Sequence, residues 1–401
     1  MLTTFFHPDK FGGAERVVYE LAKHLARIGQ EVTVLTHRAG GTREEEELDG
    51  FRVLRYPADH SGSFAFYRTV YRGVRKGLKE LLARERFDIL HTHQLLSAFA
   101  AFFPCALFKG SPVASFYAPY HQEYETKHLK GRPAAESTSR LKIVPSLISN
   151  ALRKGDRFVL ERAKAIIVLS RFSRSQVERL LRGNLDHLHV LPAGVDLDRF
   201  KPPADLEASR KRLGIPEGVP LLFSVRRLVE RMGLEDLIDA AAILARRGVP
   251  YHLALGGTGP LSKALESRAS NSPARDHIRF LGAVPEDVLP DWYGASDLFV
   301  LPTRSLEGFG MVTLEALASG VPVAGTRVGA TAEILDQVDQ RLLFEESGAE
   351  AMALHLEQLL SDPPALSEIG VKARKVVEAH YGWPRIAERT LSVYRQVLES
   401  G

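Results

Sequence analysis

Residues 306–325 read LEGFGMVTLEALASGVPVAG, and this stretch determines how the second half of the chain folds. Gly308 and Gly310 allow a tight turn close to a ligand, because glycine has no Cβ atom. From about Met311 the residues favour a helix, and the following ASGVPV favours a turn into a buried strand. A loop, a helix and a strand in direct succession are typical of a parallel α/β sheet.

Two glutamates are placed around the start of that predicted helix. Glu307 precedes the helix, and Glu315 lies roughly two turns along it. The first helical turn exposes unpaired N–H groups and a partial positive charge, which suits a phosphate. One carboxylate for a hexose, a helix end for a diphosphate and one carboxylate for a ribose make a nucleotide-sugar site. The alternative interpretation is a loop and a buried helix with two incidental glutamates.

The composition is typical of a globular protein with two or three domains. The chain has 401 residues, of which 45% are hydrophobic and 25% are charged. Its net charge of +4 is too small to indicate nucleic acid, but the charge is uneven. Residues 1–195 carry a net charge near +10, and the remainder is near −6. The basic half favours an anionic partner, such as a phospholipid surface or a phosphorylated acceptor; the alternative is an unevenly charged, solvated surface.

The sequence also constrains the compartment. Cys105 is the only cysteine, which excludes an intramolecular disulfide and a cysteine metal site. The first residues lack the pattern of a signal peptide, and the longest apolar run, 95–108, is too short to cross a bilayer. We expect a cytoplasmic protein, with contact at the inner face of the membrane as an open alternative.

Short apolar runs alternate with helical patterns along both halves, which predicts two parallel α/β domains. We expect a first domain at 1–195, a second at 196–379, and a C-terminal helix at 380–401 that packs back on the first domain. Two doubly wound domains facing each other would form a cleft at the carboxyl ends of their strands. The acidic run 44–47 and the segment 120–150 are predicted as loops. The predicted strands lie at 31–37, 51–57, 87–93, 111–117, 165–171 and 187–195 in the first half.

At this point several motifs resemble one known family, the family 4 retaining glycosyltransferases of the GT-B fold, which include glycogen-synthase-like and group 1 enzymes. The motifs are FGGAERVVYELAKHLARIG at 11–29, RRLVERMG at 226–233, LALGGTGPL at 253–261 and EGFGMVTLEALASG at 307–320. The resemblance covers nearly the whole chain in order and spacing. It implies two Rossmann-like domains and a nucleotide diphosphate sugar as donor.

In the first half, the resemblance implies that the Gly12–Gly13 loop contacts the donor. Two glycines let backbone N–H groups approach a pyrophosphate, because neither has a Cβ atom. The alternative is that the two glycines form an ordinary turn that binds no ligand. Tyr117 stands where many members carry a histidine that contacts the transferred sugar. A tyrosine can donate a hydrogen bond there but cannot take up and release a proton near neutral pH, because its ordinary pKa is about 10. His121, four residues on, is the alternative.

In the second half, the resemblance assigns Arg227 to the diphosphate, Glu307 to the hexose and Glu315 to the ribose. The family pairs this arginine with a lysine five residues on, but here that position is Met232. The departure predicts reduced activity unless Arg226 or Arg231 supplies the charge. The resemblance also places donor contacts at Gly257, Gly259, Leu281, Val284, Gly308, Phe309, Gly310, Met311 and Val312.

No convincing metal site is evident in the sequence. The string Asp196-Leu197-Asp198 is interpreted as a turn and helix cap, with metal binding the less favoured alternative. His91 and His93 alternate on a predicted strand and so share one face, which fits strand-end or buried histidines better than ligands. We therefore expect metal-independent chemistry.

The segment 67–82 is a basic amphipathic helix. Its apolar residues fall on one helical face, and five cations fall on another: Arg68, Arg72, Arg75, Lys76 and Lys79. This is consistent with contact to an anionic membrane, and equally with a domain helix that has a solvated outer face.

These observations favour a retaining, metal-independent hexosyltransferase. It would move a hexose from a UDP-sugar, or from a GDP- or ADP-sugar, to a hydroxyl of a glycan, a lipid or a small molecule. No other cofactor and no nucleic acid is expected. The alternatives are a catalytically impaired nucleotide-sugar-binding protein, prompted by Met232 and Tyr117, and a nucleotide-sugar epimerase.

Overall fold

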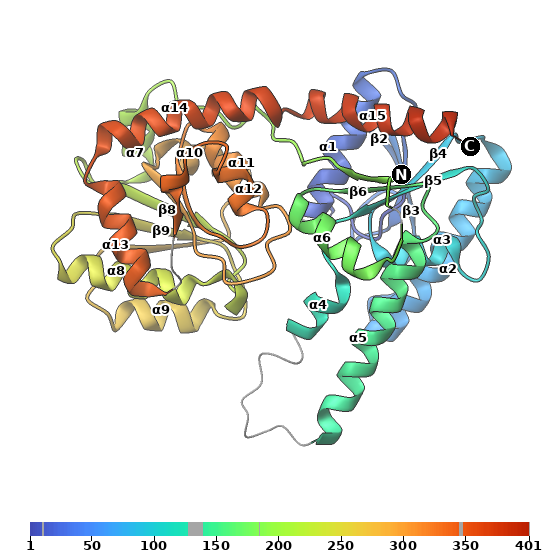
Figure 1. Cartoon of the computed structure of the whole chain (residues 1–401), viewed down its shortest axis with the longest axis horizontal. Coiled ribbons are helices and arrows are strands. Elements are labelled where there is room, and N and C mark those ends of the chain that lie inside the picture. Colours follow the sequence, from blue (N-terminus) through green and yellow to red (C-terminus); the bar gives the residue numbers. More distant parts are fainter. Residues whose placement is uncertain (10–11, 127–138, 184, 345–347, 401) are drawn as a thin grey trace. The chain divides into compact units, whose positions relative to one another are not determined.

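A computed structural model describes residues 1–9, 12–126, 139–183, 185–344 and 348–400 of the chain (Figure 1). The chain divides into two compact units. Unit 1 comprises Met1–Ala193 and Trp383–Gly401, and unit 2 comprises Gly194–Gly382. Each unit is a parallel α/β domain, so the predicted fold class is confirmed.

Unit 1 is built on two groups of strands that are joined by one residue. The strands pair in the orders β1-β3-β2 and β4-β5-β6-β7. Leu2 forms parallel bridges to both Leu35 of β1 and Thr92 of β4, so it takes the place of a first strand between the groups. The strands are β1 Thr33–His37, β2 Glu45–Leu48, β3 Phe51–Tyr56, β4 Ile89–Thr92, β5 Ser111–Phe116, β6 Ala165–Val168 and β7 Leu188–Val190.

The helices of unit 1 bury apolar faces against these strands. Val70, Val74 and Leu78 of α2 join a cluster with strand residues, and each such side chain contributes about 1.5–3 kcal/mol when fully buried. The C-terminal helix α15 lies against α1, where the ring of Trp383 stacks on His24 with 6.3 Å between centroids. The helices are α1 Gly13–Arg27, α2 Ser63–Arg84, α3 Leu95–Phe102, α4 Tyr120–Glu125, α5 Ser139–Leu160, α6 Arg171–Leu180 and α15 Trp383–Glu399.

Two loop predictions in unit 1 are wrong. The acidic run at 44–47 forms most of β2, which pairs antiparallel to β3. It can be a strand because its side chains alternate, and Glu46 turns toward the buried guanidinium of Arg55, 2.5 Å away. The predicted loop at 120–150 contains α4 and the start of α5, while residues 127–138 lie outside the described residues.

Unit 2 has one six-stranded parallel sheet with the order β10-β9-β8-β11-β12-β13. This is the order of a dinucleotide-binding fold, in which the strand sequence reverses direction between β8 and β11. Ligands of such sheets bind at the carboxyl ends of the strands beside that switch point. The strands are β8 Leu221–Val225, β9 His252–Gly256, β10 Ile278–Gly282, β11 Leu298–Leu301, β12 Val323–Thr326 and β13 Leu343–Phe344.

Helices cover both faces of this sheet (Figure 1). Helices α8, α9 and α13 share one apolar cluster with the strands, while α10, α11 and α14 pack together in contacts of their own. The central strand β11 is buried at every position, as expected for a strand covered on both faces. The helices are α7 Leu206–Leu213, η3 Glu230–Met232, α8 Leu234–Arg246, α9 Ser262–Ser270, α10 Leu289–Ala295, α11 Met311–Ala318, α12 Thr331–Leu335, η4 Gln340–Leu342, α13 Ala349–Leu360 and α14 Pro363–His380.

Candidate functional site

A buried charge pair lies at the switch point of unit 2. Arg226 follows β8 and Thr303 follows β11, and the guanidinium of Arg226 donates to the Thr303 hydroxyl and to Oε2 of Glu307. The Thr303 hydroxyl also lies 3.3 Å from Oε2 of Glu307, to which it donates. The side chains of Arg226 and Glu307 are 4% and 11% exposed. A buried carboxylate is tolerated only when it is paired, so the Glu307 side chain cannot easily leave this network. The network lies at the end of the sheet where ligands of this fold bind.

The backbone of Glu307 is fixed as well. Leu306 has φ 56°, a left-handed conformation that is uncommon for a residue with a side chain and costs roughly 1–3 kcal/mol. Nη1 of Arg231 donates to the Leu306 carbonyl at 2.9 Å. A Cβ atom at Gly329 would collide with the Glu307 carbonyl, which accepts a 3.2 Å bond from Ala330 N–H. The surrounding chain therefore holds this strained loop in one conformation.

The loop leads directly into α11, as predicted. Gly310 is the N-cap of α11 with φ 81°, so a glycine is required there. The carboxyl carbon of Glu307 lies 3.6 Å from the position of a Cβ at Gly310, which places the carboxylate beside the helix start. Gly308, Met311 and Val312 are half-buried around it, and Phe309 is buried. These residues thus lie together at the positively polarised end of α11.

Glu315 lies further along α11 and is 5% exposed. Its Oε2 accepts a 2.9 Å hydrogen bond from the hydroxyl of Tyr293 in α10. Tyr293 is fully buried, so this bond links two helices on the same side of the sheet. The carboxylate is held in place before any ligand arrives.

The glycines after β9 are required by the protein's own backbone. Gly257 has φ 121°, and a Cβ atom there would collide with the carbonyl of Arg226. A Cβ at Gly259 would likewise collide with the carbonyl of Leu228. Leu281 and Val284, at the end of β10, are half-buried at the same edge of the sheet. These four predicted donor contacts therefore cluster at the carboxyl ends of β9 and β10.

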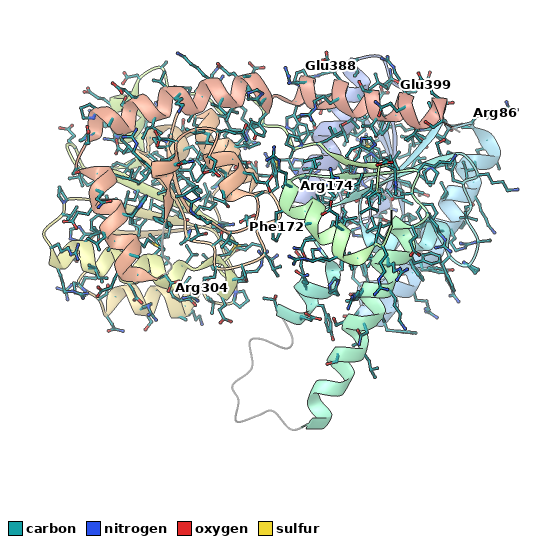
Figure 2. All side chains as sticks on the ribbon, in the orientation of Figure 1. Arg86, Phe172, Arg174, Arg304, Glu388 and Glu399 are labelled. Carbon is teal, nitrogen blue, oxygen red and sulfur yellow. The ribbon has the colours of Figure 1, made fainter. Side chains whose placement is uncertain are left out.

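Arg227 and Met232 differ sharply in exposure. Arg227 is exposed, and no residue that the structure describes pairs with its guanidinium. Met232 is 6% exposed in η3. The turn that carries it is anchored to the loop after β11, since Arg304 N–H donates to the Arg231 carbonyl at 2.9 Å. Arg304, labelled in Figure 2, is itself held by Asp236 through two bonds of 2.7 Å.

In unit 1, the predicted Gly-Gly loop meets the end of β4. Gly12 is the N-cap of α1, and a Cβ atom there would collide with the carboxylate of Glu15. Oε1 of Glu15 lies 3.4 Å from Nε2 of Gln94, which follows β4. Oε1 of Gln94 in turn accepts the N–H groups of Thr4 and Phe5 at 2.9 and 2.7 Å. Gly13 is the first residue of α1.

Tyr117 joins a chain of buried and half-buried side chains at the ends of β4 and β5. Its hydroxyl lies 2.7 Å from Nδ1 of His93, whose ring centroid is 3.9 Å from that of His91. Nδ1 of His91 lies 2.6 Å from the hydroxyl of Tyr394 in α15, and its Nε2 lies 2.8 Å from the hydroxyl of Ser115. Burial lowers the pKa of His91 to about 3 and the pKa of His93 well below its usual range. Both histidines are therefore neutral, and their exposure of 1% each bears out the buried alternative of the prediction.

His121 is not part of this chain. Its Nδ1 lies 3.4 Å from Oδ2 of Asp156 in α5, and both residues are buried. Burial raises the pKa of Asp156, against the opposing effect of His121. Burial also raises the pKa of Tyr117, so its hydroxyl stays protonated and can donate. The structure thus gives the two alternatives separate surroundings.

Within the described residues, no cluster of three or more His, Cys, Asp or Glu side chains could hold a metal ion. Oδ1 of Asp196 accepts the N–H groups of Asp198 and Arg199 at 3.1 and 3.0 Å. The predicted turn at this Asp-x-Asp string is confirmed, but the predicted helix cap is wrong, because the next helix, α7, has Asp205 as its N-cap.

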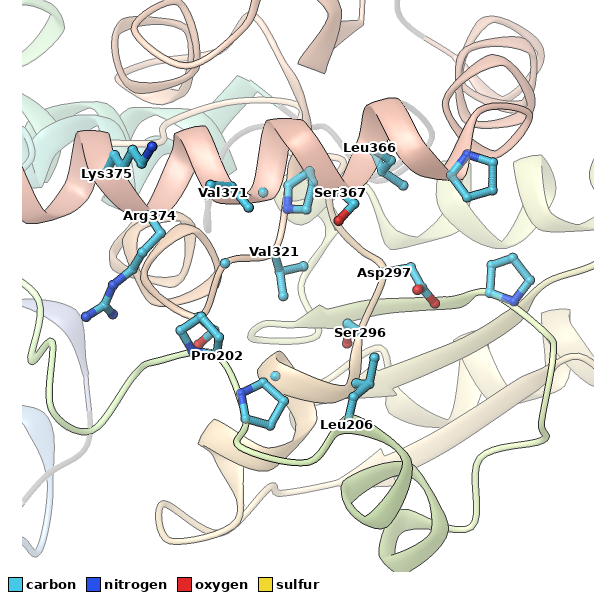
Figure 3. A pocket seen from close by; sticks show the side chains of 18 of the residues that line it. Pro202, Leu206, Ser296, Asp297, Val321, Leu366, Ser367, Val371, Arg374 and Lys375 are labelled. Carbon is cyan, nitrogen blue, oxygen red and sulfur yellow. The ribbon is translucent and has the colours of Figure 1, made fainter.

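A separate cavity of about 570 Å³ lies at the opposite, amino ends of the unit 2 strands (Figure 3). Its polar groups serve the fold. Asp297 pairs with Arg210 and accepts Leu221 N–H at 2.6 Å, while Arg374 donates to the carbonyls of Phe200 and Ala318 at 2.6 Å each. This cavity is therefore remote from the Glu307 network.

Sequence reasoning missed Arg226 and Thr303, the partners of Glu307, and Tyr293, the partner of Glu315. Thr303 and Tyr293 gave no signal, because a threonine after a strand and a tyrosine in a helix are common. Arg226 was considered only as a substitute for a missing lysine, although the doublet at 226–227 was the available clue. Arg231, the other substitute, instead supports the Leu306 carbonyl.

Comparison with solved structures identifies the fold. The sucrose-phosphate synthase from Thermosynechococcus elongatus superposes with a TM-score of 0.81 at 22% identity, over 100% of this chain and 99% of that one. At this identity the likeness shows the fold alone, which is the GT-B fold of glycosyltransferases.

Sequence comparison gives the family. Residues 11–199 match the model for Glycosyltransferase Family 4, and residues 205–376 match the model for Glycosyl transferases group 1. The chain belongs to this family of glycosyltransferases. It is 29% identical to a D-inositol 3-phosphate glycosyltransferase of Xylanimonas cellulosilytica, over 97% of the chain and 92% of the relative. It is 28% identical to a GDP-mannose-dependent alpha-(1-6)-phosphatidylinositol monomannoside mannosyltransferase of Mycolicibacterium smegmatis, over 96% and 94%.

Proposed function

We propose that the chain transfers a hexose from a nucleotide diphosphate sugar to a hydroxyl acceptor with retention of the anomeric configuration, and without a metal. The observation that carries the proposal is the paired, backbone-clamped carboxylate of Glu307 beside the N-terminus of α11. A carboxylate there accepts hydrogen bonds from hexose hydroxyls, while the helix end and the unpaired Arg227 face the diphosphate. Glu315 accepts bonds from the ribose hydroxyls.

In the proposed reaction the bond from the anomeric carbon to the diphosphate oxygen breaks, and the acceptor oxygen bonds to the same face of that carbon. The leaving diphosphate oxygen takes the proton of the acceptor hydroxyl. Arg227 and the α11 N-terminus stabilise the charge that develops on the diphosphate, so the protein acts by positioning and electrostatics. Tyr117, kept protonated by burial, donates a hydrogen bond to a sugar hydroxyl, with His121 as the alternative donor.

For the donor we propose a type of nucleotide, and for the acceptor a chemical class. We expect a UDP-sugar first, and the name of the mycolicibacterial relative makes a GDP-sugar the main alternative, ahead of an ADP-sugar. Both relatives act on phosphorylated inositols by name, and the first half of this chain is basic. We therefore propose a glycan or lipid-linked acceptor that carries phosphate.

Contact with an anionic membrane surface is proposed for α2, at the inner face of the membrane. Arg68, Arg72, Lys76 and Lys79 are exposed on this helix, and Tyr67 is 56% exposed. Arg75 is not on that face as expected, because Nη1 donates to the Ala100 carbonyl at 3.1 Å. No helix in the described part of the chain is long and apolar enough to cross a membrane.

The test is release of free nucleotide from UDP-, GDP- and ADP-hexoses by the full chain, with and without inositol phosphates as acceptors. We expect turnover with one nucleotide class, stimulated by acceptor and strongly reduced, but still measurable, in Glu307→Gln. Binding of a nucleotide diphosphate without any turnover would favour the impaired-binder alternative. Conversion of one nucleotide sugar into another without an acceptor would favour the epimerase.

A further inference from the structure

We infer that Arg226 is a positioning residue for the transfer reaction, which holds Glu307 so that only Oε1 of its carboxylate is presented to the donor sugar. The inference rests on the proposed function, because it gives the donor-sugar carboxylate of that reaction a dedicated partner. It assigns a role to the first arginine of the doublet at 226–227.

The main chain of Arg226 is fixed before its side chain reaches the site. Its N–H donates to the Gly256 carbonyl at 3.0 Å, which continues the pairing of β8 with β9. Its carbonyl packs against Gly257 so closely that no other residue fits there. The guanidinium therefore extends from a rigid strand end toward the end of β11.

The two terminal nitrogens of Arg226 are both occupied by the network. Nη1 donates to Thr303 and Nη2 donates to Oε2 of Glu307, and the side chain is 4% exposed. A guanidinium engaged in this way cannot turn to a diphosphate without leaving Glu307 unpaired in a buried position. Arg227 is exposed and has no such constraint. We therefore assign Arg226 to the Glu307 carboxylate and Arg227 to the diphosphate.

The carboxylate of Glu307 is asymmetric as a result. Oε2 takes the bonds from Arg226 and Thr303, whereas Oε1 accepts none from the residues that the structure describes. With the Leu306 and Glu307 carbonyls also bound, only this oxygen remains for a sugar hydroxyl. A lone pair fixed in direction binds a hydroxyl at lower entropic cost than a mobile carboxylate does.

The test compares Arg226→Met, Arg226→Lys and Glu307→Gln, the double variant Arg226→Met with Glu307→Gln, and Arg246→Met as a control on the exposed end of α8. We expect Arg226→Met to lower kcat about 100-fold, the usual effect of misplacing a positioning group, with little change in KM for the donor. Binding of the free nucleoside diphosphate, measured by calorimetry, should be unchanged. Arg226→Lys should keep a kcat between those of Arg226→Met and the wild type. Arg246→Met should keep the wild-type kcat.

The double variant separates positioning from a general structural effect. Because Arg226 acts through Glu307, the double variant should be no slower than Glu307→Gln alone. It also removes both charges together, so it remains informative if Arg226→Met alone leaves a buried carboxylate and fails to fold. Losses that multiply in the double variant would overturn the inference, as would wild-type kcat in Arg226→Met.

The competing role for Arg226 is to supply positive charge to the diphosphate in place of a lysine at position 232. Adding Met232→Lys to Arg226→Met tests this role. We expect no recovery of kcat, and full recovery would overturn the positioning role. Wild-type protein that releases no nucleotide from any donor would refute the proposed function itself, which is a different result from equal activity of wild type and Arg226→Met.

Discussion

The hydroxyl of Tyr293 donates a 2.9 Å hydrogen bond to Oε2 of Glu315, and this bond joins α10 to α11. Tyr293 is fully buried and packs edge-on against Phe223 of β8, so the hydroxyl cannot turn to another acceptor without repacking. The orientation of the Glu315 carboxylate is thereby tied to the core of unit 2.

Replacing Tyr293 by Phe should weaken both folding and nucleotide binding. Loss of a buried hydrogen bond to a carboxylate is expected to lower the free energy of unfolding by about 1.5–3 kcal/mol and to raise the Kd of the nucleoside diphosphate. Tyr251→Phe is the matched control, since its buried hydroxyl donates to the neutral Ala241 carbonyl at 2.6 Å. It should cost about 1 kcal/mol and leave nucleotide binding alone. Urea unfolding and calorimetry measure both effects, and equal nucleotide affinity in the two variants would contradict the link to Glu315.

The two glutamates should separate sugar from nucleoside. We expect Glu315→Gln to weaken binding of the nucleoside diphosphate about 10-fold, because a ribose hydrogen bond to a charged acceptor is lost. Glu307→Gln should bind the same nucleotide normally and lose kcat instead. Glu266→Gln on the exposed face of α9 serves as the control. The opposite pattern, with nucleotide affinity lost in Glu307→Gln, would reverse the two assignments.

Gly257 should tolerate no side chain. Gly257→Ala combines a φ of 121° with a collision against the Arg226 carbonyl, so we expect it to lower the free energy of unfolding by at least 3 kcal/mol. Gly183→Ala has a similar positive φ of 107° but open space around it, and should cost only about 1–2 kcal/mol. Denaturant unfolding of the pair isolates the steric part. Similar losses in the two variants would show that the segments after β8 and β9 can move apart.

The stability of unit 1 should fall as the pH falls below neutral. His91 has a folded-state pKa of about 3, well below the ordinary value of 6.5, so the unfolded state binds a proton that the folded state excludes. Between pH 6.5 and 3 this histidine should cost about 1.4 kcal/mol of unfolding free energy per pH unit, with His93 acting in the same direction.

Urea unfolding at pH 7.5, 6.5 and 5.5 measures this dependence. His91→Gln should be less stable at pH 7.5, because it loses bonds to Tyr394 and Ser115, yet show a shallower fall with acidity. His380→Gln, at an exposed helix end, should keep the wild-type slope. An unchanged slope in His91→Gln would mean that other groups govern the acid response.

The basic face of α2 should bind anionic lipid. Arg72→Glu with Lys76→Glu is expected to reduce sedimentation with phosphatidylserine vesicles at low salt, because each cation near the surface contributes about 1 kcal/mol. Arg246→Glu with Lys263→Glu makes the same charge change on exposed helices of unit 2 and should have little effect. Equal binding by the two double variants would leave α2 as an ordinary solvated helix.

The sequence predicted the alternation of strands and helices well because each buried strand of a parallel sheet is a short apolar run. The strand order of unit 2 could not be read from it, since strands β8 and β11 are neighbours although two other strands separate them in sequence. The same limit applies to the site. Glu307 and Glu315 were found because both belong to one local motif, whereas Thr303 meets Arg226 only through that strand order. Arg75 was misplaced because helical spacing alone does not reveal the carbonyls that draw its guanidinium inward.

The glutamates of β2 have a consequence for the behaviour of the protein in solution. This short strand pairs with β3 on one side, and Glu45 and Glu47 are exposed along it. If the same strand of a second molecule extended the sheet here, its glutamates would lie beside Glu45 and Glu47. The like charges would repel each other. The acidic run thereby discourages fibre-like association between molecules, at a position where an apolar strand would invite it.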